Sequence, residues 1–154
     1  MELAAPALAA KEIEEFLSRV NFFSKFSGAQ RARVASVSRQ VHLPAGKQVY
    51  QIGDPAYIAY VLVEGRILFS LSVGQRQASA GQVIGHGEVF GWAALVEPGQ
   101  PRNGSAMTMA PCTALAIDGA ALIAMADADH SLGYVLMRAL NKIITGTLTA
   151  FAAG

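Results

Sequence analysis

The chain has 154 residues, of which 53% are hydrophobic and 15% are charged, and its formal net charge is +1. This length suits one domain with a core large enough to fold without disulfides or metal ions. The small net charge argues against a nucleic-acid-binding surface, because such surfaces are strongly basic. The high apolar fraction indicates that a partner, most simply a second copy of the chain, covers part of the surface.

The cysteine count and the hydropathy pattern bear on the compartment. Cys112 is the only cysteine, so it can form no internal disulfide and cannot hold a metal by itself, and we expect it to be buried. Lys11 interrupts the first Ala/Leu run, and no basic cluster precedes that run. The uncharged stretch 103–117 contains Pro111 and is shorter than the about 20 apolar residues of a spanning helix. We therefore expect a soluble, cytoplasmic chain without membrane contact.

The first 38 residues are expected to be helical. Residues 8–20 place apolar side chains on one face of a helix and charged side chains around it. Three closely spaced phenylalanines follow in residues 22–26 and are expected to anchor the core. Ser27 and Gly28 then open a second short helix near residues 29–37.

From residue 39 to residue 118 the pattern changes to short β-type runs separated by glycine and proline. Such spacing predicts an all-β barrel or sandwich. Residues 60–63 and 67–69 flank a Glu-Gly-Arg turn and are expected to pair as a hairpin. Residues 105–110 and 113–117 are expected to form a second hairpin around Pro111.

Two helices are expected in residues 119–154. Asp118 is a suitable N-cap for a short helix over residues 119–126. Residues 131–151 then carry apolar side chains three and four positions apart, at Leu132, Val135, Leu136, Ala139, Leu140, Ile143, Thr147 and Leu148. Since so long a helix has little of the barrel left to cover, part of its apolar face is expected to meet another helix.

The stretch with the clearest chemistry is Phe90-Gly91-Trp92-Ala93-Ala94-Leu95, followed after a spacer by Pro101-Arg102-Asn103-Gly104-Ser105. Here a glycine opens a turn into a short apolar helix, and an arginine beside small residues follows. Such an arrangement can place backbone N–H groups and a guanidinium around one anionic group. It predicts a phosphate pocket.

This stretch resembles the phosphate-binding cassette of the cyclic-nucleotide-binding domain family, which it matches at Phe90, Gly91, Pro101, Arg102 and Ser105. The order of the runs 43–46, 53–55, 60–66 and 87–91 also resembles the family's series of strands and turns. The resemblance implies one domain over residues 1–154, mainly β with flanking helices. Residues 39–118 would form a β-roll, a jelly-roll-like barrel, between an N-terminal helical segment (1–38) and C-terminal helices (119–154).

The resemblance also implies the ligand, cyclic AMP or cyclic GMP, without a cofactor or a metal. Arg102 would hold two phosphate oxygens with its planar fork, and the N–H groups of Ala93 and Ala94 would reach the others. Ser105 or the backbone amide of Asn103 would add a neutral donor. The predicted ligand-binding residues are Gly91, Trp92, Ala93, Ala94, Arg102, Asn103 and Ser105.

Trp92 departs from the family pattern, because it stands where a glutamate normally accepts a hydrogen bond from the ribose 2′-hydroxyl. An indole donates one N–H and offers no comparable acceptor. The loss of such a bond weakens binding by about 1.5–3 kcal/mol, roughly ten- to a hundredfold. Two hypotheses therefore stay open. The chain is either a sensor in which cyclic-nucleotide binding moves the cassette helix and the C-terminal helix together, or a β-roll that no longer binds nucleotide and acts as a dimerising protein-interaction module.

Catalysis is not expected. His42, His86 and His130 are scattered along the chain, and none has a metal-ligand spacing or a nearby nucleophile motif. The resemblance implies a homodimer formed through the C-terminal helix. Relatives that regulate transcription carry a helix-turn-helix domain after that helix, whereas this sequence stops at Gly154. We therefore expect no direct DNA binding, and a signal passed to an unidentified protein partner.

Overall fold

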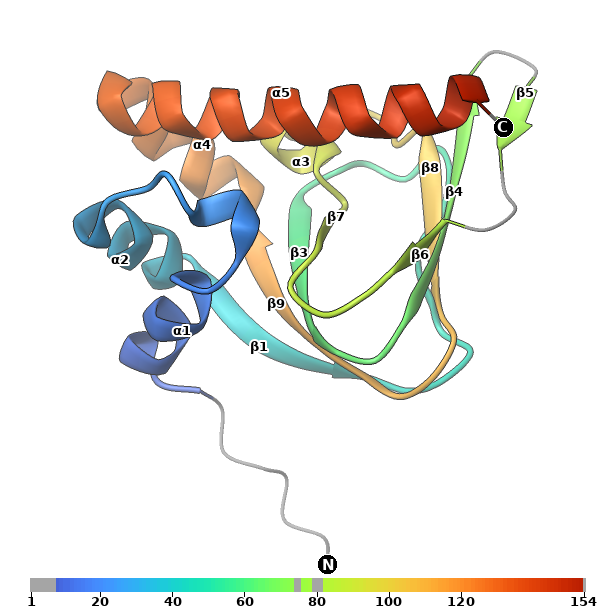
Figure 1. Cartoon of the computed structure of the whole chain (residues 1–154), viewed down its shortest axis with the longest axis horizontal. Helices are drawn as coiled ribbons and strands as arrows, with labels where there is room; N and C mark the ends of the chain where they lie inside the picture. Colours follow the sequence, from blue (N-terminus) through green and yellow to red (C-terminus); the bar gives the residue numbers. More distant parts are fainter. Residues whose placement is uncertain (1–7, 74–75, 79–81, 154) are drawn as a thin grey trace, which may run out of the picture.

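The computed structural model describes residues 8–73, 76–78 and 82–153. Short helices begin the chain, β-strands fill its middle, and two helices end it (Figure 1). The helical elements are α1 (Ala10–Leu17), η1 (Asn21–Phe23), α2 (Gly28–Ser36), α3 (Ala93–Val96), α4 (Gly119–Ala128) and α5 (His130–Ala153). The strands are β1 (Ser38–Leu43), β2 (Gln48–Tyr50), β3 (Ile58–Glu64), β4 (Ile67–Val73), β5 (Arg76–Ala78), β6 (Val83–Ile84), β7 (Val89–Phe90), β8 (Gly104–Thr108) and β9 (Cys112–Asp118).

The strands form two antiparallel sheets. One sheet has the order β1-β9-β3-β7, and the other has the order β2-β8-β4-β5, with β6 also paired to β4. This arrangement confirms a mainly β fold of the β-roll type with flanking helices. Within the part of the chain that the structure describes, the two sheets do not join into one closed barrel.

Both expected hairpins are wrong. β3 and β4 lie in different sheets, as do β8 and β9, and the actual pairs are β3 with β9 and β4 with β8. The segment that contains β3 and β4 therefore pairs with the segment that contains β8 and β9, and neither segment folds into a hairpin. They meet at their turns, where a Cβ on Gly65 (φ +109°) would lie 2.5 Å from the Cys112 sulfur and 2.8 Å from the Pro111 carbonyl oxygen. Only glycine permits both this backbone conformation and this close approach.

Two helices, α2 and α4, begin at the N-caps that the sequence predicts. The Ser27 hydroxyl accepts a hydrogen bond from the Gln30 N–H at 3.1 Å, and the Gln30 side chain accepts one from the Ser27 N–H at 2.8 Å, which is a capping box. Asp118 caps α4 by accepting from the Ala121 N–H at 3.1 Å. Phe23 packs edge to face against both Phe22 and Phe26, and all three rings are buried, as predicted.

The long helix α5 runs across one end of the β-roll, while α1 and α2 lie beneath its N-terminal half (Figure 1). Leu132, Leu136 and Leu140 are buried against the chain's own core. The first half of the apolar stripe is therefore used within the chain, and the expectation that another part of it meets a second helix stays a prediction. The C-terminal half of α5 lies over the sheets, and this placement positions the candidate site.

Candidate functional site

The predicted cassette, residues 90–105, folds as a sharp turn after β7 and a short helix. Gly91 makes the turn with φ +69°, and Trp92 is the N-cap of α3. A Cβ on Gly91 would lie 3.3 Å from the Arg102 Nη1 atom and 3.3 Å from the Ile58 carbonyl oxygen. The turn therefore requires glycine for its backbone angle and for the space beside the arginine.

Arg102 lies in the wall of the turn and is only 5% exposed. Its Nη1 donates to the Gly91 carbonyl oxygen at 3.2 Å, and its Nη2 donates to the Ile58 carbonyl oxygen at 2.6 Å. The guanidinium carbon lies 3.9 Å from the centre of the Tyr50 ring, which is a cation–π contact. The Nε atom is buried and has no hydrogen-bond partner in the described part of the chain.

The charge of Arg102 is not neutralised. Among the described residues no carboxylate oxygen lies within 4.0 Å of this guanidinium. Burial lowers the pKa of Arg102, although the nearby Tyr50, Tyr60 and Asp54 act in the opposite direction. An arginine remains protonated at neutral pH in any such environment. The site therefore contains a buried cation with no carboxylate in contact with it among the described residues, and Asp54 acts on it only from farther away.

Two tyrosines surround this cation. Burial raises the pKa of Tyr50 to about 12, and the positive charge of Arg102 only partly opposes that effect. Burial also raises the pKa of Tyr60, whose ring stacks on Phe90 with the ring centres 5.0 Å apart. Both phenols are therefore neutral at physiological pH and cannot serve as the counter-ion.

A hollow of about 140 Å³, here called the cassette cavity, opens beside Arg102. Polar atoms come from the arginine, an asparagine and a threonine, and the remaining wall is mostly apolar. Its lining residues are Tyr50, Phe69, Leu71, Gly91, Trp92, Ala93, Arg102, Asn103, Gly104, Thr147 and Leu148. The cassette, the sheet that contains β2, β4 and β8, and α5 thus all contribute to one cavity.

Five of the seven predicted ligand-binding residues line the cassette cavity, and Ala94 and Ser105 do not. Ala94 is fully buried, its N–H lies 3.4 Å from the Gly91 carbonyl oxygen, and its own carbonyl oxygen packs against Gly119. Ser105 lies within β8 opposite Ser70. Because the structure holds no ligand, all seven assignments stay predictions.

Sequence reasoning missed the cavity residues that lie outside the cassette. Tyr50 ends β2, and its contact with Arg102 joins residues 52 positions apart, which local patterns cannot show. Thr147 and Leu148 were assigned to a helix–helix face, yet they cover the cassette. The one available signal was Thr147, a hydroxyl residue within an otherwise apolar stripe.

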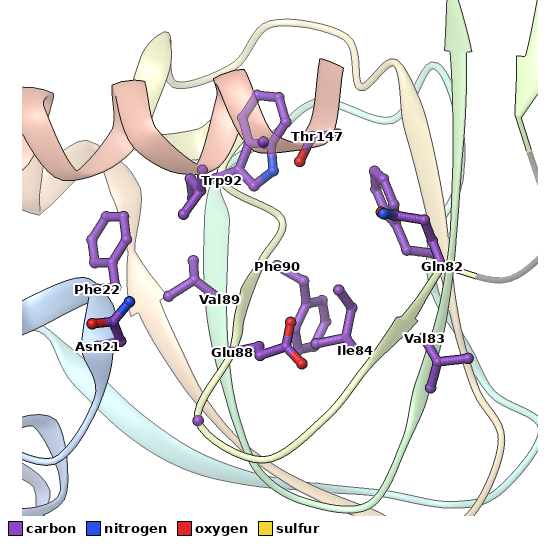
Figure 2. Close-up of a pocket in the computed structure, with 14 residues that line it drawn as sticks. Asn21, Phe22, Gln82, Val83, Ile84, Glu88, Val89, Phe90, Trp92 and Thr147 are labelled. Carbon is purple, nitrogen blue, oxygen red and sulfur yellow. The ribbon is translucent and has the colours of Figure 1, made fainter. Parts of the chain in front are cut away.

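Trp92 also lines a larger cavity of about 310 Å³, here called the roll cavity, and Phe69 and Thr147 line both cavities as well. Figure 2 shows Trp92 beneath α5 and close to Thr147, with Val89, Phe90 and Glu88 farther along the wall. Trp92 is half-buried and packs against the main hydrophobic core. Its indole therefore occupies space into which a ligand in the cassette cavity would extend.

Features that would support other functions are not found in the described residues. No group of three His, Cys, Asp or Glu side chains there is arranged to hold a metal ion. His42 and His86 are exposed, and their rings contact the Thr113 hydroxyl and the Val63 carbonyl oxygen. Cys112 is buried, as predicted. No helix in the described ranges has the length and apolar character needed to cross a bilayer.

Comparison with solved structures identifies the fold. A protein from Geobacter metallireducens is 24% identical, with a TM-score of 0.75 over 88% of this chain and 97% of that chain. A cyclic nucleotide-binding domain from Methylobacillus flagellatus is 19% identical, with a TM-score of 0.72 over 92% and 79%. The regulatory domain of Toxoplasma gondii protein kinase A, crystallised with cyclic AMP, is 19% identical, with a TM-score of 0.72 over 89% and 50%.

Comparison with curated protein sequences finds no match. The model of the cyclic nucleotide-binding domain family matches residues 40–129, which is more than half of the chain and includes the whole cassette. The two sheets, the glycine turn and the buried Arg102 agree with that match in fold and in order. The chain therefore belongs to the cyclic nucleotide-binding domain family.

Proposed function

We propose that the chain is a non-catalytic regulatory domain that binds cyclic AMP or cyclic GMP in the cassette cavity and signals through movement of α5. The observation that carries this proposal is the buried charge of Arg102, which no described carboxylate contacts. A buried cation is costly unless an anion pairs with it. A cyclic phosphodiester carries one negative charge and would supply that anion.

The walls of the cassette cavity suit the remaining parts of such a ligand. The Ala93 N–H has no acceptor among the described residues, so it can donate to a phosphate oxygen beside Arg102. Asn103 adds a polar group at the same end. Phe69, Leu71 and Leu148 supply apolar surface for a purine. Since the Ala94 N–H already faces Gly91, its proposed role is weaker than that of Ala93.

The cassette cavity is too small for a nucleotide as it stands, and this is why we propose that α5 moves when the ligand binds. Small-molecule sites usually enclose about 300 Å³ or more, and this cavity has about 140 Å³. A nucleotide would therefore have to displace Trp92, α5 or both. Because Thr147 and Leu148 of α5 form part of the wall, binding would change the position of the helix and pass the signal on.

A second candidate function is a β-roll that has lost nucleotide binding and acts as a dimerising protein-interaction module. Trp92 favours it, because its indole borders both cavities and offers no acceptor for a 2′-hydroxyl. The contacts of Arg102 also favour the interaction module. Two carbonyl oxygens and the Tyr50 ring already hold the guanidinium, and a phosphate would have to compete with them.

Isothermal titration with cyclic AMP and with cyclic GMP separates the two candidates. The wild-type protein should bind one of them at a single site. Arg102→Gln should weaken binding about ten- to a hundredfold, whereas the exposed Arg66→Gln should leave it unchanged. Arg102→Lys keeps the charge and should lose less. Absence of binding by a folded wild-type protein would exclude the sensor and leave the interaction module.

We also propose that α5 forms a homodimer through its second face. Tyr134 and Met137 are exposed by 67% and 44%. With Asn141 and Ile144 they occupy positions three and four residues apart, which is the spacing of a coiled-coil seam. The small net charge favours a protein rather than DNA as the downstream partner. The single, buried cysteine suits the reducing cytoplasm, where we place the whole 1–154 domain.

A further inference from the structure

A third hollow, of about 270 Å³, lies between η1 and the middle of α5 and is here called the basic groove. Its apolar floor includes Phe22, and its rim carries three cations, Lys25, Arg138 and Lys142. No carboxylate lines it. The basic groove shares residues with the roll cavity but none with the cassette cavity.

The three cations of the basic groove have no ionic partners. Among the described residues, no Asp or Glu oxygen lies within 4.0 Å of any of them. Arg138 and Lys142 are four positions apart on one helix, an arrangement in which like charges repel each other. The protein as a whole has a net charge of only +1. The unpaired positive charge of this groove is therefore a local concentration and does not reflect a generally basic surface.

Neutral hydrogen-bonding groups accompany the cations. Asn21, Ser24 and Asn141 also line the basic groove, and their side chains can donate to oxygen atoms. The guanidinium of Arg138 is exposed, lies 6.0 Å from the Tyr134 ring centre, and presents a planar fork suited to phosphate. The cations come from two separate elements, η1–α2 and α5, so one small anion placed between them would contact both.

From these observations we propose that the basic groove is a binding site for a compact anion with two or more phosphate groups. A single phosphate carries at most two charges and would leave one cation unpaired, whereas a diphosphate can meet all three. A hollow with an aromatic floor, enclosed between two elements, suits a compact ligand better than an extended acidic peptide. This site is separate from the cassette cavity and does not depend on the proposed binding of cyclic nucleotide.

The position of the basic groove has a consequence that does rest on the proposed function. An anion that bridges η1 and α5 would hold the helix whose later residues Thr147 and Leu148 cover the cassette cavity. The anion would then oppose displacement of the α5 turns that directly follow Lys142 and weaken cyclic-nucleotide binding, and linkage requires the converse effect as well. Binding of the anion alone can be measured without any cyclic nucleotide, so failure of one proposal is distinguishable from failure of the other.

The test is titration of the wild-type protein with inorganic pyrophosphate at low salt, followed by calorimetry and by backbone amide NMR shifts. We expect saturable binding at one site, with shifts concentrated in residues 21–25 and 138–143. Arg138→Gln combined with Lys142→Gln should weaken binding at least about tenfold, because two charge-assisted contacts are lost. Lys47→Gln, an equally exposed lysine in the turn between β1 and β2, is the matched control and should change nothing.

Three results would overturn the proposal. The first is failure of pyrophosphate to saturate the folded wild-type protein at millimolar concentration, and the second is a double variant that binds as tightly as the wild type. A third is a polyglutamate peptide that binds the same residues more tightly than pyrophosphate, because the groove would then be a peptide-docking surface. All substituted side chains are exposed, so the variants should fold, and circular dichroism checks this.

Discussion

Replacing Trp92 with glutamate should strengthen cyclic-nucleotide binding through two separable effects. The smaller side chain should connect the cassette cavity with the roll cavity, because Trp92 borders both. The carboxylate should also accept a hydrogen bond from the ribose 2′-hydroxyl. A hydrogen bond to a charged group contributes about 1.5–3 kcal/mol, which is roughly a ten- to hundredfold gain in affinity.

The same substitution should lower the stability of the fold. Trp92 is half-buried and packs against the main core. Replacing a fully buried large aromatic residue with alanine lowers the free energy of unfolding by about 3–5 kcal/mol. Because Trp92 is only half-buried, we expect Trp92→Glu to lower it by about 2 kcal/mol. Urea denaturation of the ligand-free protein measures this cost, and calorimetry with cyclic AMP and cyclic GMP measures the change in affinity.

Two further substitutions separate space from chemistry. Trp92→Ala opens the cavity without adding an acceptor, and Trp92→Gln adds a neutral acceptor of nearly the same shape as glutamate. We expect the affinity order Glu, then Gln, then Ala. If Trp92→Ala binds as tightly as Trp92→Glu, the argument about the missing acceptor is refuted, and only the steric effect of the indole remains.

Three other predictions concern the turn, the buried phenol and the helix. Gly91→Ala should lower the free energy of unfolding by more than Gly46→Ala. Both residues have positive φ, which costs about 1–2 kcal/mol in a side-chain-bearing residue, but a Cβ meets neighbours within 3.3 Å only at Gly91. Since burial raises the pKa of Tyr50 to about 12, the unfolded chain loses a proton from about pH 10 that the folded chain keeps, and stability should fall by about 1.4 kcal/mol per pH unit up to about pH 12. Tyr50→Phe should remove this component in urea titrations, and equal slopes would contradict the assignment. Met137→Lys should dissociate the proposed dimer in light scattering, whereas Thr149→Lys, at an exposed position of α5 outside that spacing, should not.

Much of the fold and the core of the cassette could be predicted because local sequence determines them. Ser27 and Asp118 act as caps through hydrogen bonds that span three residues. Gly91 and Arg102 were recognised as a turn and a cation because a glycine-opened turn before an apolar helix is a local pattern. In each case the physical cause lies within a few residues of its effect.

The errors arose where distant segments decide the structure. β3 and β4 are joined by a short turn, which favours a hairpin, yet β3 pairs with β9 and β4 pairs with β8. The two turns lie against each other at Gly65 and Cys112, and no local pattern contains this contact. The engagement of Arg102 with Tyr50 and the Ile58 carbonyl oxygen was missed for the same reason.

The way α5 is held suggests where a ligand could move it. Leu132, Leu136 and Leu140 are buried and fix the first half of the helix on the core. Beyond Ile143 the helix is mostly exposed, and it contains Gly146, a residue that weakens a helix by about 1 kcal/mol relative to alanine. A ligand can shift an equilibrium only by its difference in affinity for the two states. Moving the C-terminal turns exposes much less apolar surface than moving the whole helix, so we expect a nucleotide in the cassette cavity to displace the end of α5 while its first half stays in place.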